Sequence, residues 1–575
     1  EGSKIWARLT RDNVEKCVAI VLDDRVYSAP RVSQEIKGGS SQITGNFTLA
    51  EATDLANILK SGKMPAAAQI LQDEVVGPTL GKESVKAGFI SFLGAIAVVL
   101  LYLAFYYSTA GIVADIAMLV NMFFLMGVMA SVGVVLTLPG IAGIVLTIGM
   151  ADDANVIIFE RIREELRAGK TLRTAIADGY SNAYSAIIDG QVTTLLTGII
   201  LFAVGVGPIK GFATTLVLGI ITSLFTSIFI TRLIFDWMVD SGKTPKFSIP
   251  STAKIFLNAK YDFIGVRRKL YGFSIAIILM GVISIFVQGF NWGIDFSGGR
   301  SYMVAFPQTI ETTNLRDNLS GVLPESSVEV KTFGSGNQVK ITTDYLIDAE
   351  GEEIDRQVEK QIFEGCKALL PEGATIESFR ADHILTSSKV GPTMADDIQR
   401  KAILAVFLSL IGIFLYIFIR FRNWQYGLGA IISVLHDVAV LVSLYSLLYK
   451  FVPFSLEIDQ NFIGAVLTVI GYSVNDTVII YDRIREFNTL YPKRDKKDLF
   501  NGAMNSTLGR TMNTSLTTIL VLLVIFIWGG EVIRGFSFAM MVGIMIGTYS
   551  SVFNAAPIAF DLLQIKKKRE ALRLK

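Results

Sequence analysis

Residues 149–165 read GMADDANVIIFERIREE, and a closely similar stretch, GYSVNDTVIIYDRIREF, follows at residues 471–487. Each copy carries an aspartate, Asp153 or Asp476, within an apolar run. The neighbouring sequences repeat in the same order and direction, so the chain consists of two related halves. A parallel repeat is related by an axis along the membrane normal, and a binding or coupling site is expected where the halves meet. The other matching stretches are residues 76–107 with 390–421 and 209–212 with 533–536.

The composition is that of a membrane protein. Of the 575 residues, 51% are hydrophobic and 18% are charged, whereas a soluble chain carries about a quarter charged residues. The net charge of +2 gives no indication of a nucleic-acid partner. The two cysteines, Cys17 and Cys366, fall in different polar regions, so neither region can close a disulfide of its own.

Eleven apolar runs are long enough to cross a bilayer. Lys and Arg cluster after the third, fifth, ninth and last runs, always on one side, which the positive-inside rule makes cytoplasmic. The same map puts residues 1–85 and the insert 290–398 outside the cytoplasm. An odd number of crossings with an outside N-terminus predicts one more helix upstream. The runs lie near residues 86–107, 112–136, 139–160, 186–206, 211–236, 270–288, 400–420, 425–449, 460–481, 512–529 and 536–561.

The two outer regions are predicted to be small α+β domains. The insert has a β-α-β-β-α-β pattern, the split βαβ order of a ferredoxin-like domain, with its last strand near 374–384. The N-terminal region offers a hairpin at 17–29 and a helix near 48–62, where Thr48 and Glu51 have the spacing of a capping box. The other elements predicted in the insert are a strand at 301–306, a helix at 310–321, a hairpin of 327–333 with 338–343 turning at 334–337, and a helix near 350–369.

The predicted fold class is an α-helical polytopic membrane protein, with two parallel-repeat transmembrane halves and small α+β outer domains. The predicted divisions are a first outer region at 1–85, a transmembrane half at 86–240, a cytoplasmic linker at 241–269, a single helix at 270–289, a second outer domain at 290–398, a second transmembrane half at 399–565 and a basic tail at 566–575.

Buried charges are the candidate functional groups. A charge at the centre of a membrane helix costs about 2.5 to 3.5 kcal/mol on insertion scales, so it persists where it has a partner, water or a function. Asp153 and Asp476 occupy equivalent places if one residue of slack is allowed, and we expect them to bind an ion or a proton. The alternative is structural polar contact between helices. Arg510, absent from the matching place in the first half, is predicted to pair with Asp476.

Four further polar residues are secondary candidates. Asp152 points about 100° away from Asp153 around the helix, and we expect a rim or secondary carboxylate there. Asp189 is either a partner for Asp153 or an interfacial carboxylate. His436 and Asp437 lie mid-helix, where a proton relay and a satisfied hydrogen bond between helices are both open.

The source of energy is predicted to be an ion gradient. The sequence contains no G-x-x-x-x-G-K-[ST] loop, so direct ATP hydrolysis is not expected. Two histidines and two scattered cysteines make a zinc site unlikely to form, and no metal, cofactor or catalytic hydrolase site is predicted. One charge crossing the membrane potential supplies about 2.3 kcal/mol per 100 mV.

The motifs together resemble the bacterial protein-export membrane proteins SecD and SecF fused into one chain. Residues up to about 240 resemble SecD, and those from about 265 resemble SecF. By position, Asp153 and Asp476 match the membrane aspartates of the two halves, and Arg510 matches the arginine beside the second-half aspartate. The stretches that carry the resemblance are VGPTLG (76–81), GMADDANVIIFERIREE, GIDFSGG (293–299), LHD (435–437), GYSVNDTVIIYDRIRE and LGRTMNTSLTT (508–518).

The resemblance implies a location and a set of partners. The family belongs to the resistance-nodulation-division transporter superfamily, has twelve membrane helices and two periplasmic domains, and lies in the bacterial inner membrane. The implied partners are the bilayer, the Sec translocon (SecY, SecE and SecG), YajC and a translocating preprotein. The implied function is export of unfolded polypeptides powered by the proton or sodium motive force. It also implies that the first helix and most of the first periplasmic domain are missing here.

This sequence departs from the family at two places. The family usually has a hydrophobic residue where Asp152 stands, and Ala-Asn where Gly190 and Gln191 stand. The second departure weakens the expected partnership of Asp189 with Asp153.

Two rival functions are weaker. A superfamily exporter of small molecules or lipids would carry much larger outer domains. An intramembrane aspartyl protease would carry a Gly-x-Gly-Asp motif, whereas Asp476 follows Gly-Tyr-Ser-Val-Asn.

Overall fold

The computed structural model describes residues 2–22, 25–45, 47–61, 72–256, 259–333, 336–349 and 351–573. It divides the chain into two compact units, Glu1–Leu71 and Gln72–Lys575. Parts of several predicted segments lie outside the described residues. These are the hairpin turns at 23–24 and 334–335, the end of the helix near 62, positions 257–258 of the linker, the helix start at 350, and 574–575 of the tail.

The first unit contains the predicted hairpin and helix. Strands β1 (Ile20–Leu22) and β2 (Arg25–Ser28) pair antiparallel, and helix α2 spans Leu49–Ser61. The Thr48 backbone N–H donates to the Glu51 carboxylate at 2.8 Å, and the Glu51 N–H donates to the Thr48 hydroxyl at 3.3 Å. The capping box is therefore confirmed. Helix α1 (Gly2–Asp12) was not predicted.

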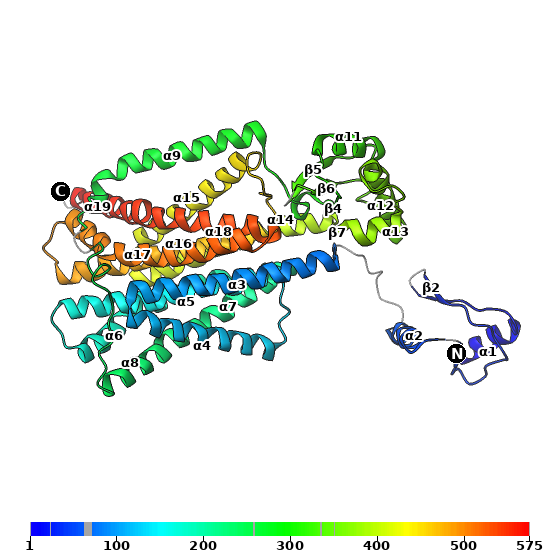
Figure 1. Cartoon of the computed structure of the whole chain (residues 1–575), viewed down its shortest axis with the longest axis horizontal. Helices are drawn as coiled ribbons and strands as arrows, with labels where there is room; N and C mark the ends of the chain where they lie inside the picture. The colour runs from blue at the N-terminus through cyan, green and yellow to red at the C-terminus, as the bar shows by residue number, and fades with distance from the viewer. Residues whose placement is uncertain are drawn as a thin grey trace. The chain divides into compact units, whose positions relative to one another are not determined.

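The second unit is a bundle of long helices joined to one sheet (Figure 1). Within the described residues, eleven helices are long and apolar enough to cross a membrane, which confirms the eleven predicted spans. Their bounds are α3 Pro78–Tyr107, α4 Thr109–Val132, α5 Leu138–Arg167, α6 Leu172–Val204, α7 Gly207–Phe225 continued by α8 Thr231–Asp240, α9 Phe263–Gln288, α14 Pro392–Phe421, α15 Trp424–Leu448, α16 Gln460–Leu490, α17 Lys496–Trp528, and α18 Glu531–Ser550 continued by α19 Ala556–Arg573.

Helices α6 and α17 begin well before the apolar runs that predicted them. Thr171 caps α6 by accepting from the Thr174 N–H, and Asp495 caps α17 by accepting from the Lys497 N–H. Hydropathy detects only the part of a helix that faces lipid, whereas these caps start each helix in polar sequence.

The last span of each half contains one π-helical turn. These turns are η1 (Thr226–Ile230), between α7 and α8, and η4 (Ser551–Ala555), between α18 and α19. Such turns are frequent at functional sites, and their matching positions agree with the repeat.

The outer sheet has five strands in the order β3-β7-β4-β6-β5, and every neighbouring pair is antiparallel. Helices α11 and α12 pack on it through a core that includes Leu319, Ile362, Val304 and Ile341. The predicted split βαβ order is confirmed. The bounds are β3 Gln72–Val76, β4 Gly299–Ala305, α11 Thr312–Val322, β5 Val328–Phe333, β6 Gln338–Thr343, α12 Glu352–Cys366 and β7 Ile384–Val390.

The last strand was predicted in the wrong place. Residues 374–384 instead contain helix α13 (Ile376–Ser378) and a π turn over Phe379–His383, and β7 starts only at Ile384. Thr375 and Ser378 form a reciprocal capping box that starts the helix and overrides the strand-like pattern. The structure also pairs β3, from the first predicted outer region, with β7.

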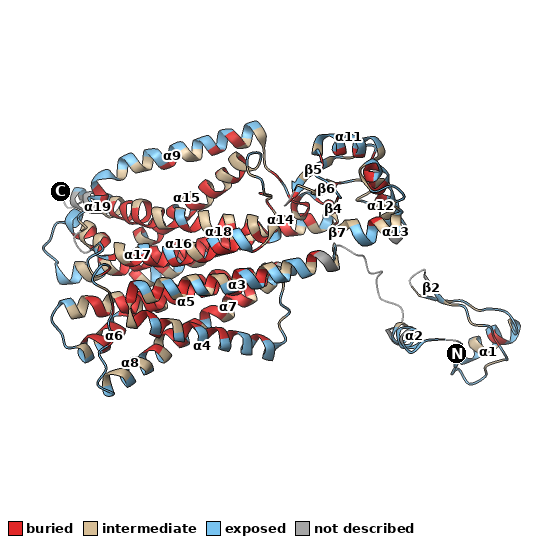
Figure 2. Ribbon diagram, viewed as in Figure 1, coloured by how far each residue is buried: buried red, intermediate tan, exposed pale blue. Residues whose placement is uncertain are grey.

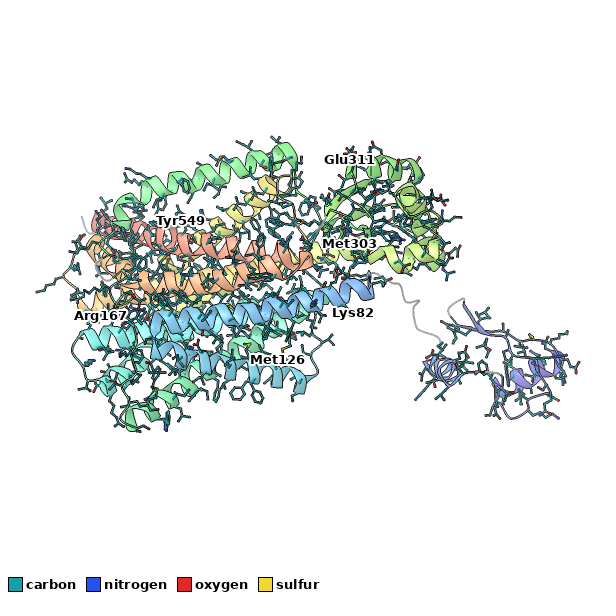
Figure 3. All side chains as sticks on the ribbon, viewed as in Figure 1. Lys82, Met126, Arg167, Met303, Glu311 and Tyr549 are labelled. Carbon is teal, nitrogen blue, oxygen red and sulfur yellow. The ribbon has the colours of Figure 1, made fainter. Side chains whose placement is uncertain are left out.

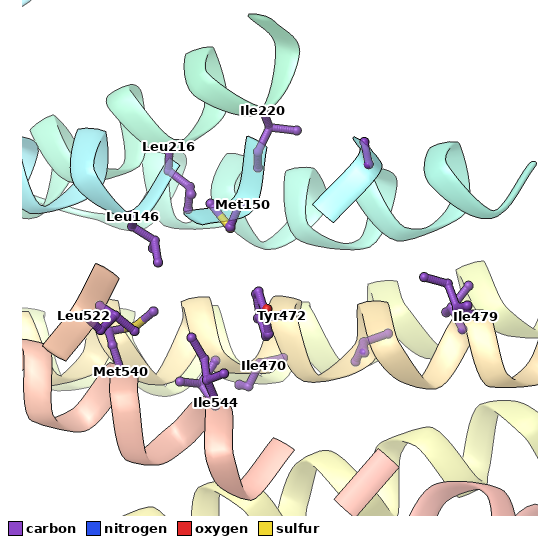
Figure 4. Close-up of a cluster of buried hydrophobic side chains, with 14 of the residues drawn as sticks. Leu146, Met150, Leu216, Ile220, Ile470, Tyr472, Ile479, Leu522, Met540 and Ile544 are labelled. Carbon is purple, nitrogen blue, oxygen red and sulfur yellow. The ribbon is translucent and has the colours of Figure 1, made fainter. Parts of the chain in front are cut away.

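The two halves meet where α5 packs against α17 and α6 packs against α16. Helices α5 and α16 are the most deeply buried of the described spans (Figure 2). Figure 4 shows the apolar part of this contact: Leu146 and Met150 of α5 lie beside Leu216 and Ile220 of α7, with Tyr472 of α16 across from them.

Small residues bring the halves into backbone contact at two equivalent points. A Cβ added to Gly149 of α5 would lie 3.1 Å from Cα of Thr518 on α17. One added to Gly471 of α16 would lie 3.2 Å from Cα of Thr194 on α6. The hydroxyls of Thr518 and Thr194 each donate at 3.4 Å to the carbonyl of the facing glycine. The contacts are thus related by the repeat.

We expect Gly471→Ala to destabilise the protein by about 1–3 kcal/mol, because the added methyl group overpacks the contact. It would lie 2.4 Å from the hydroxyl oxygen of Thr197. Thermal unfolding of purified protein measures the change. Gly127→Ala on α4 is the control, since no atom lies within 4 Å of its added Cβ. Equal unfolding temperatures for both variants would contradict the close approach.

Candidate functional site

Arg510 lies between the two membrane aspartates. Its Nη2 donates to Oδ1 of Asp153 at 3.1 Å, and its Nη1 is 3.8 Å from Oδ1 of Asp476. The amide of Asn475 donates to the other oxygen of Asp153. The side chains of Arg510, Asp153 and Asp476 are all at most 6% exposed. One cation is therefore shared by two carboxylates from opposite halves.

The predicted ion pair of Arg510 with Asp476 is confirmed at 3.8 Å, but the direct hydrogen bond of Arg510 goes to Asp153, which was not predicted. Without a gap, the two repeated motifs align Asp153 with Asn475 and leave Asp476 one residue later. That step rotates Asp476 by about 100° around its helix. The ungapped alignment was the signal that could have identified Asn475 as the contact of Asp153.

Asp189 contacts the other half and not Asp153. It accepts hydrogen bonds from the hydroxyl of Tyr416 and from Nε of Arg420, each at 2.7 Å, and both donors belong to α14. In the matching contact, Tyr102 donates to Asn513 at 2.7 Å. Asp189 is therefore the interfacial carboxylate of the two alternatives.

Asp437 joins three helices. One carboxylate oxygen accepts from the hydroxyls of Ser473 at 2.6 Å and Ser550 at 2.7 Å, and the other lies 3.0 Å from Nδ1 of His436. This network satisfies the buried carboxylate and connects α15, α16 and α18. The two serines were not predicted, because nothing in the sequence distinguishes them from other polar residues in the spans.

Asp152 is not at the rim of the site. It is fully buried, and neither of its carboxylate oxygens has a hydrogen-bond partner. It is thus a separate buried carboxylate on α5.

A cavity of 790 Å³ leads to Arg510 from one end of the bundle. Figure 3 places Arg167 at this end, away from the sheet marked by Met303. The positive-inside rule predicts that this end is the cytoplasmic one. Residues lining the cavity include Arg161, Glu164, Arg483, Lys497 and Arg510.

The mouth of this cavity carries a symmetric ring of four charges. Arg161 pairs with Glu486 at 2.8 Å, and Arg483 pairs with Glu164 at 2.9 Å. These are equivalent residues of the two repeated motifs, so each half supplies one arginine and one glutamate to the other. The ring joins the C-terminal ends of α5 and α16.

A second cavity, of 490 Å³, lies between the sheet and the bundle. Lys340 of β6 pairs there with Glu457, in the loop before α16, at 2.5 Å. Burial raises the pKa of Glu457, but the charge and hydrogen bond of Lys340 outweigh burial, and the net pKa lies below its ordinary value. Burial, with the charge of Asp295, raises the pKa of Asp459 to about 7.

Lys340→Met should loosen the sheet from the bundle at neutral pH, because Glu457 is left buried without its cation. We expect the β6 amides to exchange hydrogen roughly ten to a hundred times faster. The pKa of Glu457 is lowered in the folded protein, so its ion pair with Lys340 stabilises the fold at pH values above 4.5, the ordinary pKa of a glutamate. The effect of the substitution should therefore shrink as the pH falls below 4.5. Lys360→Met, at an exposed position of α12, is the control. Unchanged hydrogen exchange at pH 7 would show that the ion pair of Lys340 and Glu457 does not hold the sheet against the bundle.

Comparison with known proteins agrees with this architecture. Residues 56–241 and 374–565 match the family described as protein export membrane protein SecD/SecF, C-terminal, residues 283–306 match its GG motif, and residues 1–66 match the SecDF P1 head subdomain. Protein translocase subunit SecDF of Brucella abortus is 36% identical over 97% of this chain and 71% of its own length. That of Thermus thermophilus is 36% identical over 99% and 74%.

A solved structure shares the fold over almost the whole chain. The crystal structure of SecDF, a translocon-associated membrane protein from Thermus, superimposes with a TM-score of 0.78 at 33% identity, covering 98% of this chain and 74% of that one. The fold and the site define a polytopic helical membrane protein whose two related halves share buried charges. The chain belongs to the SecD/SecF family of protein-export membrane proteins.

Proposed function

We propose that this chain is an auxiliary component of the bacterial Sec protein translocase, and that it couples inward ion flow to the export of unfolded polypeptides. One observation carries the coupling: Arg510 is shared by Asp153 and Asp476, one from each half, at the inner end of a cavity. The family supports the role in export.

The charges of the site suggest how an ion would act. With both carboxylates ionised, one arginine leaves one excess negative charge, so a bound proton or Na⁺ makes the site neutral. An ion bound at Asp153 would weaken the hydrogen bond between Asp153 and Arg510. The guanidinium of Arg510 would then pair with Asp476 alone. Because these aspartates belong to different halves, loading and unloading would alter the contact between α5 and α16. Each charge that crosses supplies about 2.3 kcal/mol per 100 mV.

The further assignments follow from the family. The protein would lie in the inner membrane, associate with SecY, SecE, SecG and YajC, and act without a hydrolase site. The sheet domain and the first unit would bind and release the emerging preprotein on the outer side.

Flux measurements test the proposal. Full-length protein in proteoliposomes is exposed to a proton gradient and, separately, to a sodium gradient, with a pH-sensitive dye and ²²Na⁺ as readouts. Preprotein transport is followed in parallel in vesicles that also contain the translocon. We expect one gradient to drive both flux and transport. The coupling would be refuted if the rate of preprotein transport were the same with and without each gradient.

A further inference from the structure

A second group of buried oxygen atoms lies in the first half, away from Arg510. Asp152 is fully buried, and both of its carboxylate oxygens lack a hydrogen-bond partner. One turn further along α5, Asn155 is 2% exposed, and its amide oxygen is also without a partner. Oδ1 of Asp115, on the adjacent helix α4, is the fourth buried oxygen without a partner.

These side chains lie close together. Positions 152 and 155 are neighbours on one face of α5, and the Asn155 amide lies beside the carboxylate of Asp152. Asp115 and Asp153 are the charges that act on Asp152, and α4 packs directly against α5. The four unpaired oxygens thus belong to neighbouring side chains, and within the described residues the Asn155 amide is the one donor beside them.

No cation of the described residues balances this group. Asp152 and Asp115 form no ion pair with any lysine, arginine or histidine in the described ranges. Arg510, which pairs with the adjacent Asp153, is already shared by Asp153 and Asp476. Leaving a buried carboxylate ionised and uncompensated costs several kcal/mol. Its charge must therefore be neutralised by something that binds there.

The second half lacks the group. The repeat places Val474 opposite Asp152 and Ile431 opposite Asp115, so both acids are replaced by apolar residues. The second half packs the matching helices without these acids. Packing alone therefore does not require them in the first half. The difference favours a ligand that only the first half binds.

We propose that Asp152, Asp115 and Asn155 form a second monovalent-cation site, which takes a proton or Na⁺ and is separate from the site at Arg510. All of its ligands are oxygen atoms, the donors that hard cations prefer. The site does not depend on the proposed function, because it rests on unpaired atoms that take no part in the Arg510 cluster.

Two measurements on purified full-length protein distinguish the two cations. The first is equilibrium binding of ²²Na⁺ at pH 8. The second is labelling with dicyclohexylcarbodiimide at pH 7, followed by mass spectrometry, because this reagent modifies protonated carboxyl groups in apolar surroundings. Each is repeated on Asp152→Val, which copies the second half and should fold, and on Asp236→Asn, an exposed carboxylate of α8.

A Na⁺ site predicts that Asp152→Val binds about one ²²Na⁺ fewer than the wild-type protein, and that Asp236→Asn binds as many as the wild type. A proton site predicts no such ion but modification of Asp152 or Asp115, which falls at least fivefold on raising the pH to 10. Asp152→Val should then also reduce labelling at Asp115, because the two acids no longer share the site. If the wild-type protein neither binds Na⁺ nor is labelled at either residue, the proposal is wrong.

Discussion

Arg510→Ala is expected to abolish ion flux and to destabilise the protein by about 3–5 kcal/mol, because removing one partner of a buried ion pair leaves the other charge uncompensated. Here two carboxylates, Asp153 and Asp476, would lose their shared cation. Flux in proteoliposomes and thermal unfolding in detergent measure the two effects. No other substitution of a single residue at this site removes a partner from both halves at once.

Arg510→Lys separates the two effects. A lysine keeps the charge, which should preserve folding, but its single ammonium group cannot reach two carboxylates in the manner of a guanidinium. We expect a stable protein with flux reduced at least tenfold. Arg232→Ala, on the exposed surface of α8, is the control and should leave both measurements unchanged. Wild-type flux in Arg510→Lys would show that bridging the halves is unnecessary.

Asp153→Asn is expected to stop ion flux while leaving the protein folded. An amide has nearly the same shape as a carboxylate but does not titrate in the physiological range. The substitution also leaves Arg510 balanced by Asp476 alone, so no buried charge is left uncompensated. We expect flux at the level of protein-free liposomes and an unfolding temperature within a few degrees of wild type.

The matched variant is Asp476→Asn, which removes the second carboxylate and leaves the hydrogen bond between Arg510 and Asp153. A relay through both aspartates predicts equal loss in the two variants. Substantial flux in Asp476→Asn alone would assign ion binding to Asp153 and leave Asp476 a structural role. Flux in both variants would place the ion path elsewhere.

Hydropathy was sufficient to predict the spans, because each must be apolar over its length in lipid. The repeat likewise predicted that Asp153 and Asp476 occupy equivalent places, with a coupling site where the halves meet. It did not predict which pair forms the hydrogen bond, because a one-residue offset changes the face of a helix and similarity of two motifs does not fix it. The sequence also did not predict the partners of Asp189, because Tyr416 and Arg420 belong to a helix that is distant in the sequence.

Strand β3 has a consequence for the order in which the protein is assembled. It pairs with β7, and the first transmembrane half and the rest of the sheet separate the two strands in the chain. During synthesis the edge of β3 therefore stays unpaired until β7 has been made. Strands that lie far apart in the sequence pair slowly, and an unpaired strand edge can pair with another chain. The sheet is therefore completed only after the first transmembrane half, α9 and the remaining strands have been made.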